Sequence, residues 1–168
     1  MERILICSDI HGCKENFRQA LKEAGRIDRI LIAGDIEGRQ EAYEQMAGMI
    51  PILIVQGNCD VYQGGDLPET VSFTLEGKRF FMTHGHLYGA GGGNPSRLLA
   101  KARRIKADIV IFGHSHRYVD EWQEGIHLLN PGALRGTPGY NACSYLVLEL
   151  DEATGREEAI PCSLSENW

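Results

Sequence analysis

Three short apolar segments in the first part of the chain are each followed at once by polar residues. They are residues 4–7 before Ser8-Asp9-Ile10-His11-Gly12, residues 30–33 before Gly34-Asp35, and residues 51–55 before Gln56-Gly57-Asn58-Cys59-Asp60. A strand that is apolar throughout is typical of a sheet covered on both faces, where polar residues are confined to the strand ends. Ligands of such sheets bind beyond the carboxyl ends of the strands. The pattern therefore predicts a covered sheet with a polar site along one edge.

The residues between these segments have helical spacing. Residues 17–24 place four apolar side chains on one helical face, and Gly25 follows where a helix commonly ends. Residues 40–49 repeat the pattern, with Met46 and Met49 on the expected apolar face. Two helical crossovers between successive strands predict that the first three strands are parallel.

The second half of the chain favours hairpins. Residues 70–75 and 79–82 flank Glu76-Gly77-Lys78, a short connection that contains glycine. A third helix is predicted to begin at Asn94-Pro95, with Asn as N-cap, and to run through Ile105. Further strands, mostly antiparallel, are predicted at residues 109–112, 118–122, 126–129, 144–150 and 157–160. Together these elements predict an α/β fold, a four-layer α/β/β/α sandwich of two mixed sheets flanked by helices, in one domain spanning 1–168.

Composition excludes some classes of partner. Acidic residues outnumber basic ones by 23 to 17, a net charge of −6, which argues against binding of duplex nucleic acid. The chain shows neither the apolar region of a signal peptide nor a run long enough to span a membrane, so no membrane association is expected. The five cysteines lack the close pairing of a zinc ribbon, and a reducing cytoplasm is the simplest compartment for them.

Two histidine clusters, His84-Gly85-His86 and Gly113-His114-Ser115-His116, also follow apolar segments. Imidazole, carboxylate and amide ligands without clustered thiolates suit first-row divalent ions such as Mn²⁺, Fe²⁺, Zn²⁺ or Ni²⁺. The seven candidate ligands, more than one four-coordinate ion needs, are Asp9, His11, Asp35, Asn58, His84, His114 and His116. They are sufficient for two ions that share Asp35. The isolated His127 is expected to be a hydrogen-bonded structural residue.

These motifs resemble, in order, the five blocks of the calcineurin-like metallophosphoesterases. The match spans Asp9 to His116, and the turn Asn130-Pro131-Gly132-Ala133 resembles a further block of the small prokaryotic phosphodiesterase branch. Each motif is weak alone, whereas five in the same order are specific. The retromer scaffold subunit also resembles this branch.

The resemblance implies two divalent metal ions per chain, with manganese preferred among manganese, iron, zinc and nickel. One ion would be held by Asp9, His11, Asp35 and His116, and the other by Asp35, Asn58, His84 and His114. It also implies hydrolysis of phosphodiester bonds through a metal-bridging hydroxide. Asn58 and His84 would thus belong to the catalytic centre.

Cys59 departs from many relatives, in which a histidine follows the asparagine and supports protonation of the leaving alkoxide. A thiol is a poorer match for that role, so we expect a preference for esters whose leaving group departs with little protonation, such as aryl phosphodiesters. Cys59 would then lie beside the leaving group, or it is only a small loop residue. His86 is expected to support His84 from behind rather than to contact substrate. Arg135 could bind a phosphate oxygen, although solvent exposure is the simpler expectation.

Two alternative functions are compatible with the same motifs. One is a non-catalytic metal-binding scaffold of the same fold, and the retained His11 and full ligand set argue against it. The other is a phosphomonoesterase, which the cysteine at position 59 disfavours. The expected partner is a small phosphate-ester substrate, and a homo-oligomer is an expectation from resemblance alone.

Overall fold

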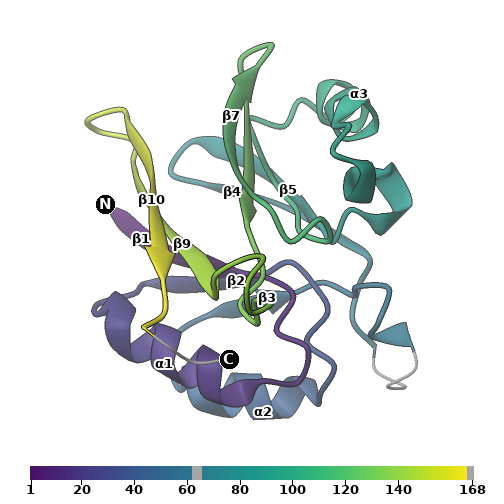
Figure 1. The fold of residues 1–168 in the computed structure, drawn as a ribbon. Coiled ribbons are helices and arrows are strands. Elements are labelled where there is room, and N and C mark those ends of the chain that lie inside the picture. Colours follow the sequence, from purple (N-terminus) through teal and green to yellow (C-terminus); the bar gives the residue numbers. More distant parts are fainter. Residues whose placement is uncertain (62–65, 166–168) are drawn as a thin grey trace.

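Two five-stranded sheets lie face to face between helices in the computed structural model of the chain, which describes residues 1–61 and 66–165 (Figure 1). The first sheet has the order β10-β9-β1-β2-β3. Its strands are β1 (Glu2–Cys7), β2 (Arg29–Ile32), β3 (Ile52–Ile54), β9 (Ser144–Asp151) and β10 (Arg156–Ser163). The second sheet has the order β4-β5-β6-β8-β7. Its strands are β4 (Thr70–Leu75), β5 (Lys78–Thr83), β6 (Ile109–Ile111), β7 (Tyr118–Gln123) and β8 (Ile126–Pro131).

Helices cover the outer face of each sheet. α1 (Lys14–Ala24) and α2 (Gln40–Ala47) pack on the first sheet, as the shared core of Phe17, Tyr43 and Leu5 shows. α3 (Ser96–Ile105) packs on the second sheet, and the short 3₁₀ helices η2 (His86–Tyr88) and η3 (Ala90–Gly92) connect it to β5. The inner faces of the two sheets bury a third cluster between them. The predicted four-layer α/β/β/α sandwich is therefore confirmed.

The strand directions follow from these crossovers. β1, β2 and β3 are parallel, as predicted. The prediction of mostly antiparallel strands in the second half holds for β7, β9 and β10, whereas β6 is parallel to both neighbours, β5 and β8. The reason is that α3 forms a crossover between β5 and β6, and a helical crossover returns the chain in the same direction. Both sheets are therefore mixed, and each has several carboxyl ends at the same edge.

Helix ends agree with the sequence signals except at two positions. The predicted N-cap of the third helix is off by one residue, because Pro95 and not Asn94 occupies the N-cap position of α3. α1 ends before Gly25, and Asn94 Oδ1 accepts a hydrogen bond from the backbone N–H of Ser96 at the start of α3. The prediction for Met49 is wrong: α2 stops at Ala47, and Met49 is fully exposed. Gly48 adopts a φ of 63°, a left-handed conformation that ends the helix before Met49 can join its apolar face. No helix among residues 1–61 and 66–165 is long and apolar enough to span a bilayer.

His127 lies at the start of β8, at the opposite end of that strand from the Asn130 turn. Its side chain is buried, its Nδ1 lies 2.7 Å from Glu157 Oε2 on β10, and its Nε2 lies 2.6 Å from Asp120 Oδ1 on β7. The Trp122 ring stacks on it, and Lys78 forms an ion pair with Glu157. His127 therefore connects the two sheets and is structural, as predicted.

Replacing His127 with glutamine is expected to lower the free energy of unfolding by about 2 kcal/mol near pH 6, because charged hydrogen bonds of this kind contribute about 1.5–3 kcal/mol. Burial would lower the pKa of His127, but Glu157 and Asp120 outweigh it and raise that pKa above its usual value of 6.5. The extra stability of the wild type over the variant should be fully present below the pKa of His127 in the unfolded chain. It should decline as the pH rises through the raised pKa of His127 in the folded protein. Urea unfolding of both proteins from pH 6 to pH 9 measures this. A difference that grows with pH would contradict the assignment.

Candidate metal centre

The predicted ligands follow five strands whose carboxyl ends meet at one edge of the sandwich. Loops after β1, β2, β3, β5 and β6 carry Asp9 with His11, Asp35, Asn58, His84, and His114 with His116. Ile10 anchors the first loop in the core, and Gly113 N donates to His84 O, which joins the last two loops. The topology thus brings residues from position 9 to position 116 to one place.

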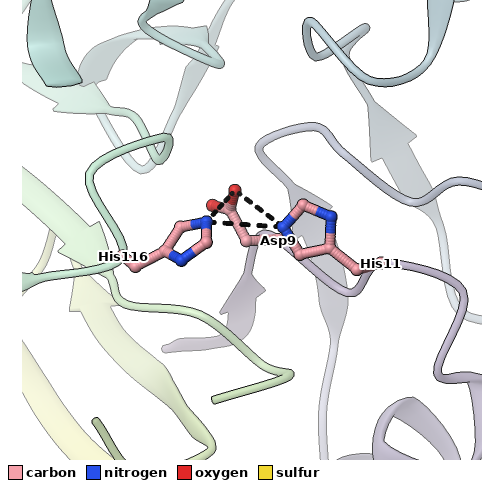
Figure 2. A group of neighbouring side chains, drawn as sticks. All are labelled: Asp9, His11 and His116. Carbon is pink, nitrogen blue, oxygen red and sulfur yellow. Dashed lines mark hydrogen bonds and ion pairs between the residues drawn. The ribbon is translucent and has the colours of Figure 1, made fainter. Parts of the chain in front are cut away.

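A first group consists of Asp9, His11 and His116 (Figure 2). The two imidazole rings come from different loops and point towards the Asp9 carboxylate. Asp9 Oδ1 lies 3.1 Å from His116 Nε2 and 3.6 Å from His11 Nε2. The two histidine Nε2 atoms are 3.4 Å apart. Three potential ligand atoms therefore converge on one point.

A second group consists of Asp9, Asp35 and His84, and all three side chains are buried. His84 Nε2 lies 3.2 Å from Asp35 Oδ2 and 3.8 Å from Asp9 Oδ1. Asp9 therefore belongs to both groups, and Asp35 belongs to the second.

Hydrogen bonds leave one oxygen of each aspartate directed into the centre. Asp9 Oδ2 accepts from Ser8 Oγ at 2.7 Å and from the backbone N–H of His114 at 3.1 Å. Asp35 Oδ1 accepts from the backbone N–H of Cys59 at 2.9 Å. Asp9 Oδ1 and His84 Nε2 are buried without a hydrogen-bond partner among the described residues. Buried polar atoms without partners are costly and rare, so these two atoms fit the ligands of a cation.

The histidine rings are oriented by bonds at their other nitrogen. His84 Nδ1 lies 2.7 Å from the carbonyl oxygen of Ala33, so it carries the proton and leaves the Nε2 lone pair facing Asp35. His11 Nδ1 lies 2.5 Å from Glu37 Oε1. Metal-binding histidines usually have such a partner, which fixes both the tautomer and the ring orientation.

The backbone of the centre is strained. Six of its residues other than glycine have a positive φ, a conformation that such residues rarely adopt. They are Asp9 (55°), His11 (47°), Asp35 (56°), Glu37 (46°), His114 (70°) and His116 (60°). Strained residues of this kind concentrate at functional sites, where the surrounding structure holds them in place.

The electrostatics of the two groups are coupled. Burial would raise the pKa of Asp9, but the neighbouring imidazoles of His11 and His116 hold it below its usual value. Burial acts in the same way on Asp35, and His84 lowers its pKa. The Asp9 carboxylate beside it raises the pKa of His11 to about 9. The carboxylates are therefore charged at neutral pH, and cations would compete with protons for the histidines.

The remaining predicted residues surround these two groups. His114 packs against His84 with ring centroids 5.1 Å apart, and His86 lies beside both rings. Asn58 is exposed, and its amide donates to Cys59 Sγ. Burial raises the pKa of the Cys59 thiol to about 12. Arg135 is exposed, and its guanidinium donates to the carbonyl oxygen of His11 at 2.9 Å.

Sequence reasoning missed several residues that position the ligands. Ser8 and Glu37 hold Asp9 and His11 directly. Asp60 is buried and accepts from the backbone N–H groups of Asp35 and Gly57, both at 2.8 Å. Asn130 donates to Gly113 O and to Ser115 Oγ, each at 3.1 Å, and so supports the loop of His114 and His116. Asp60 and Asn130 are part of the motifs named above, but a motif alone does not show which backbone groups these side chains contact.

The family model of the calcineurin-like phosphoesterase superfamily domain matches residues 2–153. A probable metallophosphoesterase, YsnB of Bacillus subtilis, is 34% identical over 155 residues, which cover 91% of this chain and 88% of that protein. The phosphodiesterase YfcE of Escherichia coli is 35% identical over 106 residues, 60% of this chain and 53% of that protein. The chain therefore belongs to the calcineurin-like phosphoesterase superfamily.

Solved structures agree in fold. A predicted phosphoesterase of Streptococcus pneumoniae superposes with a TM-score of 0.76 at 25% identity and covers 97% of this chain and 98% of that one. Vps29 of Entamoeba histolytica, complexed with zinc, has a TM-score of 0.72 at 22% identity and covers 96% of this chain and 98% of that one. Both similarities extend over almost the whole chain, so both sheets of the sandwich are shared with these proteins.

Proposed function

We propose that this chain is a phosphodiesterase that works with two divalent metal ions. The observation that carries the proposal is the pair of converging groups that share Asp9, with Asp9 Oδ1 and His84 Nε2 buried and without a hydrogen-bond partner among the described residues. Divalent ions in this arrangement would lower the pKa of a bound water molecule and neutralise charge on the phosphoryl oxygens. The family membership and the phosphodiesterase named among the relatives support the same reaction.

The proposed ligand sets are those implied by the motifs. Asp9, His11, Asp35 and His116 would hold one ion, and Asp35, Asn58, His84 and His114 the other. Asp35 would be shared between the ions, and Asp9, which the two converging groups have in common, would lie beside it. Manganese is the preferred metal, with iron, zinc and nickel as alternatives. The donor set of imidazole, carboxylate and amide oxygen fits all four.

The surrounding residues would fix the ligands before substrate binds. Ser8 and the backbone N–H of His114 hold Asp9, and Ala33 O and Glu37 hold the proton-bearing nitrogens of His84 and His11. Ligands held in this way need little rearrangement when charge develops on the substrate, which is the main source of electrostatic catalysis.

The proposed substrate is a small phosphodiester. The leaving group would lie near Asn58 and Cys59, His86 would support the ligands from behind, and Arg135 would contact a phosphate oxygen. The proposed partners include neither duplex nucleic acid nor a membrane. Association into a homo-oligomer is proposed from the family resemblance alone. Among the described residues, Cys7, Cys13, Cys59 and Cys162 form no disulfide, which is compatible with the proposed cytoplasmic location.

The protein, stripped of metal and reloaded with Mn²⁺, is expected to hydrolyse bis(p-nitrophenyl) phosphate faster than p-nitrophenyl phosphate. Release of p-nitrophenolate measures both rates, and isothermal titration measures metal binding. Faster turnover of the monoester would favour a phosphomonoesterase. Bound metal without turnover of either ester would favour the non-catalytic scaffold of the same fold.

A related assay tests the role of Cys59. If the thiol is the reason for a diester preference, Cys59→His is expected to raise the rate on an alkyl phosphomonoester, whose leaving alkoxide needs a proton, by about tenfold relative to the rate on bis(p-nitrophenyl) phosphate. Release of inorganic phosphate measures the first rate, and the expectation follows because a positioned acid contributes at least about a hundredfold to proton transfer. An unchanged ratio would assign Cys59 to the loop alone and would leave the phosphodiesterase proposal in place.

A further inference from the structure

Two cavities border the loop that carries His114 and His116. The first has a volume of about 430 Å³, and its lining includes His116, Tyr118, Ala142, Pro161, Cys162 and Ser163. We call it the edge cavity. The second, of about 290 Å³, is lined by residues that include Ala90, Pro95, Phe112, Val119 and Glu121, and we call it the α3 cavity. The edge cavity falls within the usual size of small-molecule sites, about 300–1,000 Å³.

The edge cavity is formed where the two sheets meet. Ser144 Oγ donates to the carbonyl oxygen of Pro131 at 2.8 Å and so joins β9 to β8. Ser163, the last residue of β10, pairs with Ser144, and Tyr118, the first residue of β7, pairs with Pro131. The cavity therefore lies between regular strands of both sheets, which makes it a fixed part of the fold.

The edge cavity adjoins the metal centre directly. His116 contributes to its wall, and Nε2 of the His116 ring lies 3.1 Å from Asp9 Oδ1. Asn141 Nδ2, also on the wall, donates to the carbonyl oxygen of His116 at 3.3 Å. Of the α3 cavity's described lining, by contrast, no residue is a proposed metal ligand.

The edge cavity and Cys59 lie on opposite sides of β1. In the first sheet β9 and β10 lie on one side of β1, and β2 and β3 lie on the other. Cys59 follows β3, whereas Ser144 and Ser163 belong to β9 and β10. A substrate centred on Asp9 and Asp35 would thus have one side towards Cys59 and the other towards the edge cavity.

The chemistry of the edge cavity suits an organic group attached to an anion. Tyr118, Ala142 and Pro161 supply apolar surface, and Arg117 adds a cation at the lining. None of the described residues that line it is acidic. The α3 cavity shares Arg117 and Tyr118 but also contains Glu121, whose carboxylate would repel a phosphate ester.

We propose that the edge cavity binds the retained organic group of a phosphodiester, and that this group is aromatic. The inference rests on the proposed function. In the hydrolysis, the oxygen of water bonds to phosphorus, the P–O bond to the leaving group breaks, and the leaving oxygen takes up a proton. The other ester bond remains intact, so its organic group stays in the cavity as part of the monoester product. A phosphomonoester has no such group, which gives the diester a binding advantage.

A bulky residue in the edge cavity should abolish this advantage. Bis(p-nitrophenyl) phosphate and methyl p-nitrophenyl phosphate have the same leaving group and differ only in the retained group. Ser163→Trp is expected to lower the ratio of their kcat/KM values, aryl over methyl, by about tenfold, because full burial of an aromatic ring is worth at least that factor. Ser163 is exposed, and the independent variant Ala142→Phe should act in the same direction. The control Glu121→Trp, which places the same side chain at the α3 cavity, should leave the ratio unchanged.

Other outcomes separate this proposal from the proposed function. An unchanged ratio in Ser163→Trp and Ala142→Phe, or an equal loss on both esters, would overturn the edge-cavity proposal while turnover by the wild type upholds the phosphodiesterase. If the wild type hydrolyses neither ester, the phosphodiesterase proposal is wrong. Titration with diphenylphosphinate, followed by ¹H–¹⁵N spectra, then tests separately whether the edge cavity binds an aromatic group. Shifts at residues 142–144 and 162–163 would support it. Shifts at residues 119–121, or none at either place, would overturn it.

Discussion

Replacing Asp9 with asparagine is expected to lower kcat/KM by about a thousandfold or more and to weaken Mn²⁺ binding by at least about a hundredfold. Ion activation of water and charge neutralisation supply several kcal/mol, which corresponds to factors of this size. The Ser8 hydroxyl and the His114 N–H both donate to Asp9 Oδ2, so an amide would keep its oxygen there. Its NH₂ group would then face His11, His84 and His116, where it cannot bind a cation.

Steady-state kinetics and calorimetry with Mn²⁺ measure the two effects. Asp66→Asn is a matched control, because Asp66 is exposed and lies outside both ligand groups. Far-ultraviolet circular dichroism shows whether the variant keeps its fold. An Asp9→Asn protein that is folded and retains full metal affinity and turnover would disprove the central place given to Asp9.

Replacing Gly57 with alanine is expected to destabilise the protein by about 3 kcal/mol and to remove most of its activity. A Cβ atom at this position would lie 2.0 Å from Asp35 Oδ1 and 2.5 Å from Asp35 N. The second atom belongs to the backbone, which Asp60 holds in place, so Asp35 or the whole loop has to move. Overpacking of this kind typically costs about 1–3 kcal/mol, and a clash with backbone lies at the upper end.

Urea unfolding and Mn²⁺ titration of the variant measure both consequences. Gly92→Ala is the control, because a Cβ added at Gly92 would meet no atom within 4 Å and the φ of this residue is not left-handed. It should change the free energy of unfolding by less than about 1 kcal/mol. Equal stability of Gly57→Ala and wild type would show that the loop has room to relax, and would contradict the tight packing of Gly57 on Asp35.

Much of the fold could be predicted from periodicity. The apolar segments that end in Asp9, Asp35 and Asn58 became parallel strands, because such segments are stable only when covered on both faces. The apolar positions of residues 17–24 became the buried face of α1. Met49 shows the limit of this reasoning: the same period continued past Ala47, but the left-handed backbone of Gly48 ended the helix. The backbone conformation of a glycine decides where such a helix ends, and the spacing of apolar residues does not reveal that conformation.

The candidate site was predictable as a set of residues and not as a geometry. Ligand types at strand ends identified Asp9, His11, His84 and His116 before any contact was known. The sequence could not show that Asp9 belongs to both groups, because that depends on distances between loops that are far apart in the chain. The same holds for Glu37, which is one of many exposed or half-exposed glutamates until its contact with His11 is seen.

The sequence by itself determined which side chains are candidate metal ligands and that they follow strands, since side-chain chemistry and the apolar pattern of a strand are local properties. Only the tertiary structure decided which oxygen of each aspartate faces the centre, how His84 and His11 are oriented, and that a cavity opens beside His116. These features depend on hydrogen bonds and packing between segments distant in sequence. Such contacts form only when the two sheets meet, and no local pattern encodes them.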